Sequence, residues 1–158
     1  MKSNTIFYNE KTLKTPCILS AILSDEMILY IKTKKAYSDG AGESFIELQQ
    51  LFGKQCHCLE KAIDDIAERI KLCKKTIGTL HHFLELSASK NSPQYYGSSK
   101  ETLKELLKDH EIVISQLRQN RVEKNENYND DNTDDFIKSL LEQHETTAYT
   151  LNIYLGHL

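Results

Sequence analysis

Two acidic side chains in the middle of the chain, Asp64 and Glu68, have the spacing of metal ligands. In a helix, residues four apart lie on one face, so these two carboxylates could bind one hard or borderline cation. The same spacing also suits a solvated helix face on which Arg69 and Lys71 balance the acids. The pattern therefore indicates a candidate metal site, with a solvated helix face as the alternative.

Three further residues lie on the same face of this predicted helix: Gln49, Gly53 and Glu60. Gln49 and Asp64 are separated by roughly 22 Å along a helix that rises 1.5 Å per residue. One chain cannot bring them to a single metal ion. They could meet only if two copies of the helix packed antiparallel across a twofold axis, so a composite site here must lie between subunits.

A second group of acids precedes the last predicted helix, at Asp130, Asp131, Asp134 and Asp135. Acidic residues are favoured at helix N-termini by the helix dipole, and this accounts for them structurally. The functional alternative is an acidic opening that concentrates divalent cations.

The cysteines and histidines give weaker indications. Cys56, His57 and Cys58 are consecutive, but residues two apart on a helix point about 200° apart and cannot chelate one ion. His110 and His144 fall on apolar seams, where we expect hydrogen-bonded core histidines. We therefore expect reduced thiols and no histidine ligand.

The composition describes a globular chain without a membrane span. There are 20 basic and 23 acidic residues, a formal net charge of -3, which argues against a generally DNA-binding surface. Only the N-terminus is weakly basic, through Lys2, Lys11 and Lys14. It shows no signal peptide, so we expect a cytoplasmic protein.

Apolar periodicity predicts four long helices and one short one. The first should begin at a Thr15–Pro16 cap and run to about Ser38. We expect a flexible tail over 1–15 and one domain over 16–158. The remaining helices are expected at about 45–73, 79–87 (the short one), from a Ser98 cap to about 117, and from the acidic group to about 155. The fold class is all-α, an up-and-down four-helix bundle.

Several residues, in order, match one known family in spacing. They are Lys32, Thr33, Gly42, Phe45, Leu48, Leu51 and Phe52, followed by the runs 64–70, 77–80, 130–135 and 142–149. Over roughly residues 17 to 155 the chain resembles the Dps (DNA-protection-during-starvation) mini-ferritins. The resemblance implies a ferritin-like bundle whose long crossover carries a short extra helix between the second and third helices.

The resemblance also implies a function. Dps proteins form a twelve-subunit shell that oxidises iron at twofold interfaces, stores it as mineral and protects DNA from peroxide in the stress response. Their ferroxidase site takes two histidines and an acid from one subunit and an acid pair from its neighbour. Asp64 and Glu68 match that acid pair, and Asp130, Asp131, Asp134 and Asp135 would line the iron-entry pore.

The other half of the expected ferroxidase site is missing. Its two histidine positions are Tyr37 and Gln49, and its acid position is Gly53. A neutral phenol and an amide are poor Fe(II) ligands, and glycine offers none.

Three hypotheses follow. The first is a homo-oligomeric cage, expected to have twelve subunits, that binds iron and no organic cofactor, stores the iron with slow oxidation and protects DNA from oxidative damage. The second is a ferroxidase-inactive shell with a structural or DNA-binding role through Lys2, Lys11 and Lys14. The third is a bundle that has lost the cage and pairs with another protein.

Overall fold

The computed structural model describes residues 10–39, 45–73, 75, 77–86, 97–124, 128 and 130–158. Within these ranges the regular structure is helical: α1 (Glu10–Asp39), α2 (Phe45–Leu72), the short α3 (Leu80–Leu86), α4 (Ser99–Val122) and α6 (Asp131–His157). None of these helices combines the length and the apolar character that crossing a membrane requires.

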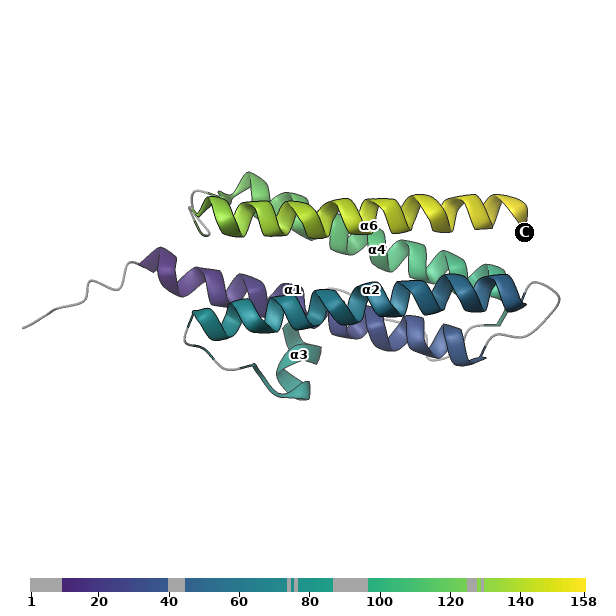
Figure 1. Cartoon of the computed structure of the whole chain (residues 1–158), viewed down its shortest axis with the longest axis horizontal. Helices are drawn as coiled ribbons and strands as arrows, with labels where there is room; N and C mark the ends of the chain where they lie inside the picture. Colours follow the sequence, from purple (N-terminus) through teal and green to yellow (C-terminus); the bar gives the residue numbers. More distant parts are fainter. Residues whose placement is uncertain are drawn as a thin grey trace, which may run out of the picture.

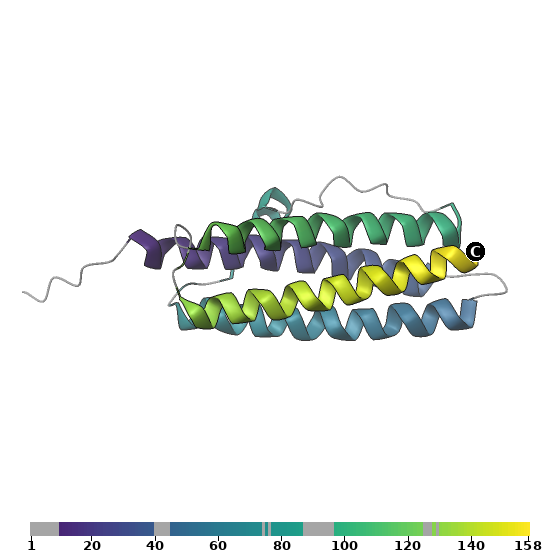
Figure 2. The ribbon, with the colours of Figure 1, turned by 90° about the horizontal axis from the view of Figure 1, so that it is seen from above.

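The four long helices form two antiparallel hairpins (Figures 1 and 2). Helix α1 packs along α2, and α4 packs along α6. The two hairpins lie against each other, and α3 lies outside the bundle beside α1, within the crossover between α2 and α4 (Figure 1). This arrangement confirms the predicted ferritin-like bundle with its short extra helix.

Leucine and isoleucine stripes fill the space between the helices because residues at helical spacing share one face. Leu23 of α1, Ile66 of α2, Leu106 of α4 and Ile137 of α6 are all fully buried. The stripe on α2 follows the predicted positions from Leu48 to Ile70. The periodicity of the sequence therefore located the core.

The start of the first helix differs from the prediction. Helix α1 begins at Glu10, and Pro16 lies inside it, so the expected Thr15–Pro16 cap is wrong. Lysine and leucine before the proline favour helix, and Pro16, in the second turn of α1, leaves the helix without one intrahelical hydrogen bond. The division into a tail over 1–15 and a domain over 16–158 stays a prediction.

A buried ion pair joins the two hairpins. Lys32 Nζ of α1 lies 2.7 Å from Asp109 Oδ2 of α4, and both side chains are almost completely buried. Burial raises the pKa of Asp109 and outweighs the opposing effect of Lys32. Desolvation of the Asp109 carboxyl is thus the larger of the two opposing effects on its pKa, as can occur in a buried ion pair.

Breaking this pair from one side should be costly. We expect Asp109→Asn to lower the free energy of unfolding by about 3–5 kcal/mol, because it leaves the buried Lys32 ammonium without this carboxylate. The double replacement Lys32→Met with Asp109→Leu should recover most of that loss. Urea denaturation measures both, with the exposed Lys104→Gln of α4 as control. A double variant as unstable as Asp109→Asn would contradict this energetic account.

Candidate functional site

Asp64 and Glu68 lie where the metal hypothesis needs them, on the outer face of α2. Both are exposed. Neither makes a hydrogen bond or ion pair with the described part of the chain. Arg69, the residue that could have balanced them, instead lies over the Phe136 ring of α6, 4.0 Å from its centroid. The two carboxylates are therefore free to bind a cation.

Tyr37 and Gly53 form a packed pair at the other end of the same face. A Cβ atom built on Gly53 would lie 3.3 Å from Tyr37 Cε2 and 3.6 Å from Cδ2. The half-buried Tyr37 ring thus covers the α2 backbone at Gly53. Lys34 Nζ lies 5.0 Å from the centroid of that ring, within cation–π distance. Tyr37 and Gly53 therefore form one steric unit, and their correspondence to a ferroxidase histidine and acid stays a prediction.

The two ends of this face do not meet within one chain. Gly53 and Asp64 are about 16 Å apart along the helix axis, given the rise per residue. Within the described residues, no group of three or more histidine, cysteine, aspartate or glutamate side chains could hold a metal ion. Asp64 and Glu68 would thus need ligands from a second copy, as the sequence spacing indicated.

The acidic residues before α6 have structural partners. Asp130 is the N-cap and accepts hydrogen bonds from the backbone N–H groups of Asn132 and Thr133, each at 3.1 Å. A further hydrogen bond from the Thr133 hydroxyl is the main cause that lowers the pKa of Asp130. Substituting such a cap typically costs about 1 kcal/mol, so the helix-start interpretation accounts for Asp130.

Asp134 is held even more firmly. Arg121 Nε and Nη2 donate to its two carboxylate oxygens at 3.1 and 3.3 Å, and the Tyr128 hydroxyl donates at 3.1 Å. The Arg121 contact lowers the pKa of Asp134. Asp131 pairs with Lys124 at 2.7 Å, whereas Asp135 is exposed. The pore role of the four acids stays a prediction, and Asp135 is the residue best able to serve it.

The bundle interior contains a chain of polar contacts that only partly follows from the sequence. His144 Nε2 of α6 lies 2.6 Å from Glu26 Oε1 of α1, and His144 Nδ1 lies 2.9 Å from His110 Nδ1 of α4. All three side chains are almost fully buried. The two histidines are hydrogen-bonded core residues, as expected. Sequence reasoning missed Glu26, although a glutamate between Ile22 and Leu29 on an apolar seam was a signal.

The side chains of Glu26, His144 and His110 are arranged to hydrogen-bond to one another and not to bind a metal ion. The ring nitrogens face each other or the carboxylate, so His144 has no nitrogen left for a metal ion. Within the described part of the chain, the buried atoms Glu26 Oε2 and His110 Nε2 have no hydrogen-bond partner. Burial, assisted by His144, holds the pKa of His110 well below its ordinary value. His110 is therefore neutral at pH 7.

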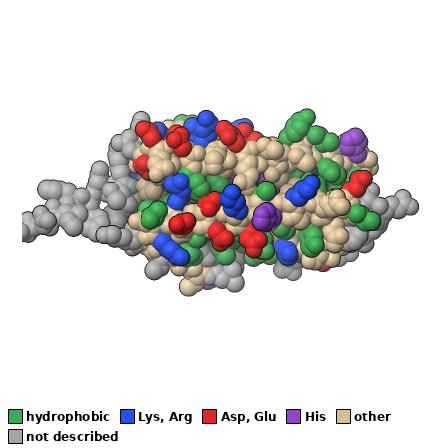
Figure 3. Space-filling model, viewed as in Figure 1, with side chains coloured by type: hydrophobic (Ala, Val, Ile, Leu, Met, Phe, Trp, Pro, Cys, Tyr) green, Lys and Arg blue, Asp and Glu red, His purple; other side chains and the backbone are tan. Residues whose placement is uncertain are grey.

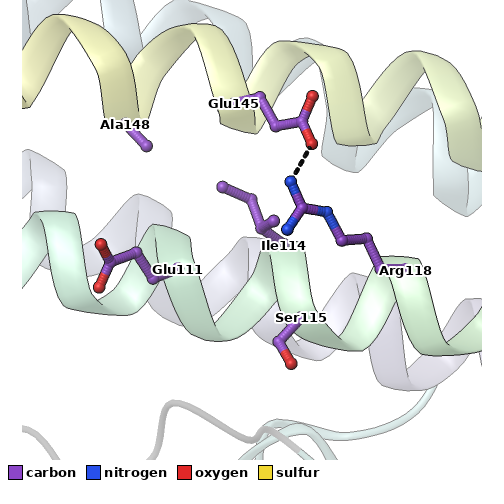
Figure 4. A pocket seen from close by; sticks show the side chains of 6 residues that line it. All are labelled: Glu111, Ile114, Ser115, Arg118, Glu145 and Ala148. Carbon is purple, nitrogen blue, oxygen red and sulfur yellow. Dashed lines mark hydrogen bonds and ion pairs between the residues drawn. The ribbon is translucent and has the colours of Figure 1, made fainter.

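A shallow pocket of about 380 Å³ opens between α4 and α6 (Figure 4). Arg118 Nη2 and Glu145 Oε1, 2.6 Å apart, bridge it. Its lining contains no histidine or cysteine, so Ser115 has no base there to make it a nucleophile. On the face shown in Figure 3, Lys and Arg side chains are interspersed with Asp and Glu. The charged side chains of the described residues therefore do not gather into a patch of one sign on that face.

The lowered pKa of His110 predicts acid sensitivity. Below about pH 6.5 the unfolded chain binds a proton at His110 that the folded chain does not, so stability falls as the pH falls. We expect this group alone to cost about 1.4 kcal/mol per pH unit in that range. Urea denaturation at several pH values gives the slope of the unfolding free energy against pH. In His110→Leu this slope should be smaller by the equivalent of about one proton. The exposed His57→Gln should keep the wild-type slope, and equal slopes in all three proteins would refute the assignment.

The contact of Tyr37 with Gly53 predicts an energetic coupling. Alanine in a helix interior is favoured over glycine by about 1 kcal/mol, so Gly53→Ala should show that gain in a Tyr37→Ala background. In the wild type the added methyl must displace the ring, which should reduce the gain by about 0.5–1 kcal/mol. Denaturation of the four proteins at one concentration gives the coupling energy. An equal gain in both backgrounds would show that the ring moves freely.

Comparisons with known proteins agree on the family. Residues 17–158 match the family model for the ferritin-like domain. An uncharacterised low-temperature-induced protein of Nostoc sp. (strain PCC 7120) is 33% identical over 139 residues, which are 87% of this chain and 78% of that protein.

Solved structures agree on the fold. DpsC from Streptomyces coelicolor superposes with a TM-score of 0.87 at 24% identity, covering 98% of this chain and 91% of that one. Dps from Bacillus brevis gives 0.85 at 21% identity, with 94% and 99% covered. A dodecameric thioferritin, the bacterioferritin-related protein from Bacteroides fragilis, gives 0.84 at 20%, with 92% and 86% covered. The chain therefore belongs to the ferritin-like domain family and has the subunit fold of the Dps mini-ferritins.

Proposed function

We propose that this chain is the subunit of an iron-storing, Dps-like cage that binds iron where the outer faces of two α2 helices meet. One observation carries the proposal: Asp64 and Glu68 are exposed on that face and make no hydrogen bond or ion pair with any residue that the structure describes. Carboxylates with no protein partner on the surface of a ferritin-like bundle are available to iron and to a second subunit.

The spacing along α2 supports a twofold contact. In an antiparallel pair whose axis passes between positions 58 and 59, Asp64 lies level with Gly53 of the second copy. The same register brings Glu68 level with Gln49 of that copy. A single twofold rotation thus aligns both pairs of positions, as an isologous interface requires. Tyr37, which covers Gly53, then lies near the acids of the second copy.

The bundle interior does not fit an internal di-iron centre. Ferritin-like di-iron sites in bundles use a glutamate from each of several helices together with two histidines. Here Glu26 is the one carboxylate that contacts His144 or His110, and the histidines bond to each other. We therefore place iron, which is the cargo of the protein, at the subunit contact.

The available ligands support binding better than rapid catalysis. Two carboxylates hold Fe(II) loosely, and no histidine occupies the ferroxidase positions Tyr37 and Gln49. The cage would oxidise iron slowly or only store it. The alternative is a ferroxidase-inactive shell with a structural role.

The assembly into a homo-oligomer is better supported than the role in DNA protection. A ferritin-like neighbour is a dodecamer, which supports a homo-oligomer of that size here. Iron would enter past Asp130, Asp131, Asp134 and Asp135. Protection of DNA rests on family resemblance: Lys2 lies outside the described residues, Lys11 lies on α1 but its side chain is not described, and Lys14 is exposed near the start of α1.

The proposal predicts an iron-binding cage that depends on two specific acids. Size-exclusion with light scattering should give a multimer, with about twelve chains expected. In anaerobic equilibrium dialysis, Asp64→Asn with Glu68→Gln should lower Fe(II) bound per chain at least about tenfold, because it removes the anionic ligands. Asp65→Asn is the matched control, since Asp65 is exposed on another face of the same helix.

Two results would defeat the proposal. One is a wild-type protein that stays monomeric. The other is iron binding that survives the loss of Asp64 and Glu68 or falls equally in the Asp65 control. Oxygen added after loading, with absorbance followed against buffer, separates a slow ferroxidase from an inactive store.

A further inference from the structure

We propose that this intersubunit site is selective for ferric iron and that the Tyr37 phenolate is one of its ligands. The inference rests on the proposed function, because Asp64 and Glu68 must come from a second copy. It concerns the oxidation state of the iron that the site takes and the residue that determines it.

The structure fixes the position of Tyr37. Its ring lies against the α2 backbone at Gly53, where any larger residue would push it away. Lys34 Nζ lies over the ring, 5.0 Å from its centroid, in a cation–π contact. Tyr37 is half-buried, so part of the ring remains at the surface of the α1–α2 hairpin. The phenol is thus a positioned group and not a mobile surface side chain.

The donor atoms around this position are all oxygen. Tyr37 offers a phenol, and Gln49 offers an amide carbonyl from the same chain. Asp64 and Glu68 of the second copy offer two carboxylates. The nearest imidazole along the face is His57, one helical turn or about 6 Å beyond Gly53 along the axis. Cys56, beside it, is buried.

Such a donor set discriminates between the two oxidation states of iron. Fe(II) is borderline and gains most from imidazole ligands, which this site lacks. Fe(III) is harder and more highly charged, so anionic oxygen ligands stabilise it far more. On binding, Fe(III) displaces the phenolic proton of Tyr37 to solvent and forms an iron–phenolate bond, with no change in oxidation state. The replacement of histidine by tyrosine thus exchanges ferrous for ferric preference.

This preference assigns the site a place in a reaction sequence. A separate one-electron oxidation of Fe(II), by oxygen or peroxide, must supply the ferric ion. The site would then retain Fe(III) at the subunit contact and could seed mineral growth, whereas the histidine-containing version would perform the oxidation itself.

The test uses the assembled full-length protein titrated with ferric citrate. Iron(III)–phenolate bonds absorb visible light through charge transfer from the ring, whereas carboxylate-bound iron does not give that band. We expect a visible band that saturates with bound iron. Tyr37→Phe should abolish it and weaken ferric binding at least about tenfold. This variant keeps the ring against Gly53, so the fold is preserved.

Two matched controls isolate the phenol and the alternative ligand. Tyr149→Phe removes the hydroxyl of an exposed tyrosine on α6 and should leave the band unchanged. His57→Gln removes the nearest imidazole and should also leave it unchanged. Wild-type protein dialysed against Fe(II) without oxygen should bind at least about tenfold more weakly than against Fe(III).

The outcomes separate this inference from the proposed function. Ferric iron that binds through Asp64 and Glu68 without a visible band, or with a band that survives Tyr37→Phe, overturns the inference and leaves the iron cage standing. Loss of the band in His57→Gln, or equal affinity for Fe(II) and Fe(III), also overturns it. Iron binding that is independent of Asp64 and Glu68 overturns both.

Discussion

The register between the two helical hairpins depends on buried polar contacts that cross from α1 to the α4–α6 pair. Glu26 meets His144, which meets His110, and Lys32 meets Asp109. Apolar side chains tolerate a small slip of one helix along another, but a buried carboxylate or ammonium that loses its partner costs several kcal/mol. These contacts therefore specify one alignment of the hairpins among the many that would bury a similar apolar area.

The outer face of α2, and not the bundle interior, carries the candidate metal ligands. The polar side chains in the core hydrogen-bond to one another, and both ring nitrogens of His144 take part. On the outer face, by contrast, Asp64 and Glu68 have no partner in the described part of the chain. Tyr37 and Gly53 show that the other end of this face is well packed, since the ring fills the space that a larger residue at position 53 would need. Tyr37 and Gly53 are thus coupled by packing, so a change at one position affects the other.

The sequence predicted the features that depend on neighbours a few residues away. Helical periodicity located α2, and Ser98 was recognisable as the cap of α4, where its side chain accepts from Glu101 N–H at 3.2 Å. The sequence did not predict contacts between distant positions. Glu26 and His144 are 118 residues apart in the chain, and no local pattern identifies them as partners. The packing of Tyr37 on Gly53 was equally hidden, because sequence showed two absent ligands and not the contact between their replacements. Pro16 misled because proline favours helix starts, whereas the helix formers before it extend α1 back to Glu10.

A metal site divided between two subunits links iron binding to assembly. If each copy supplies ligands that the other lacks, iron binds the paired state more tightly than the single chain, and by linkage iron must strengthen the pairing by the same free energy. If Asp64 and Glu68 are ligands, the contact between subunits would thus respond to iron, whereas the buried contacts of Glu26, Lys32 and Asp109 lie within one subunit and do not depend on it.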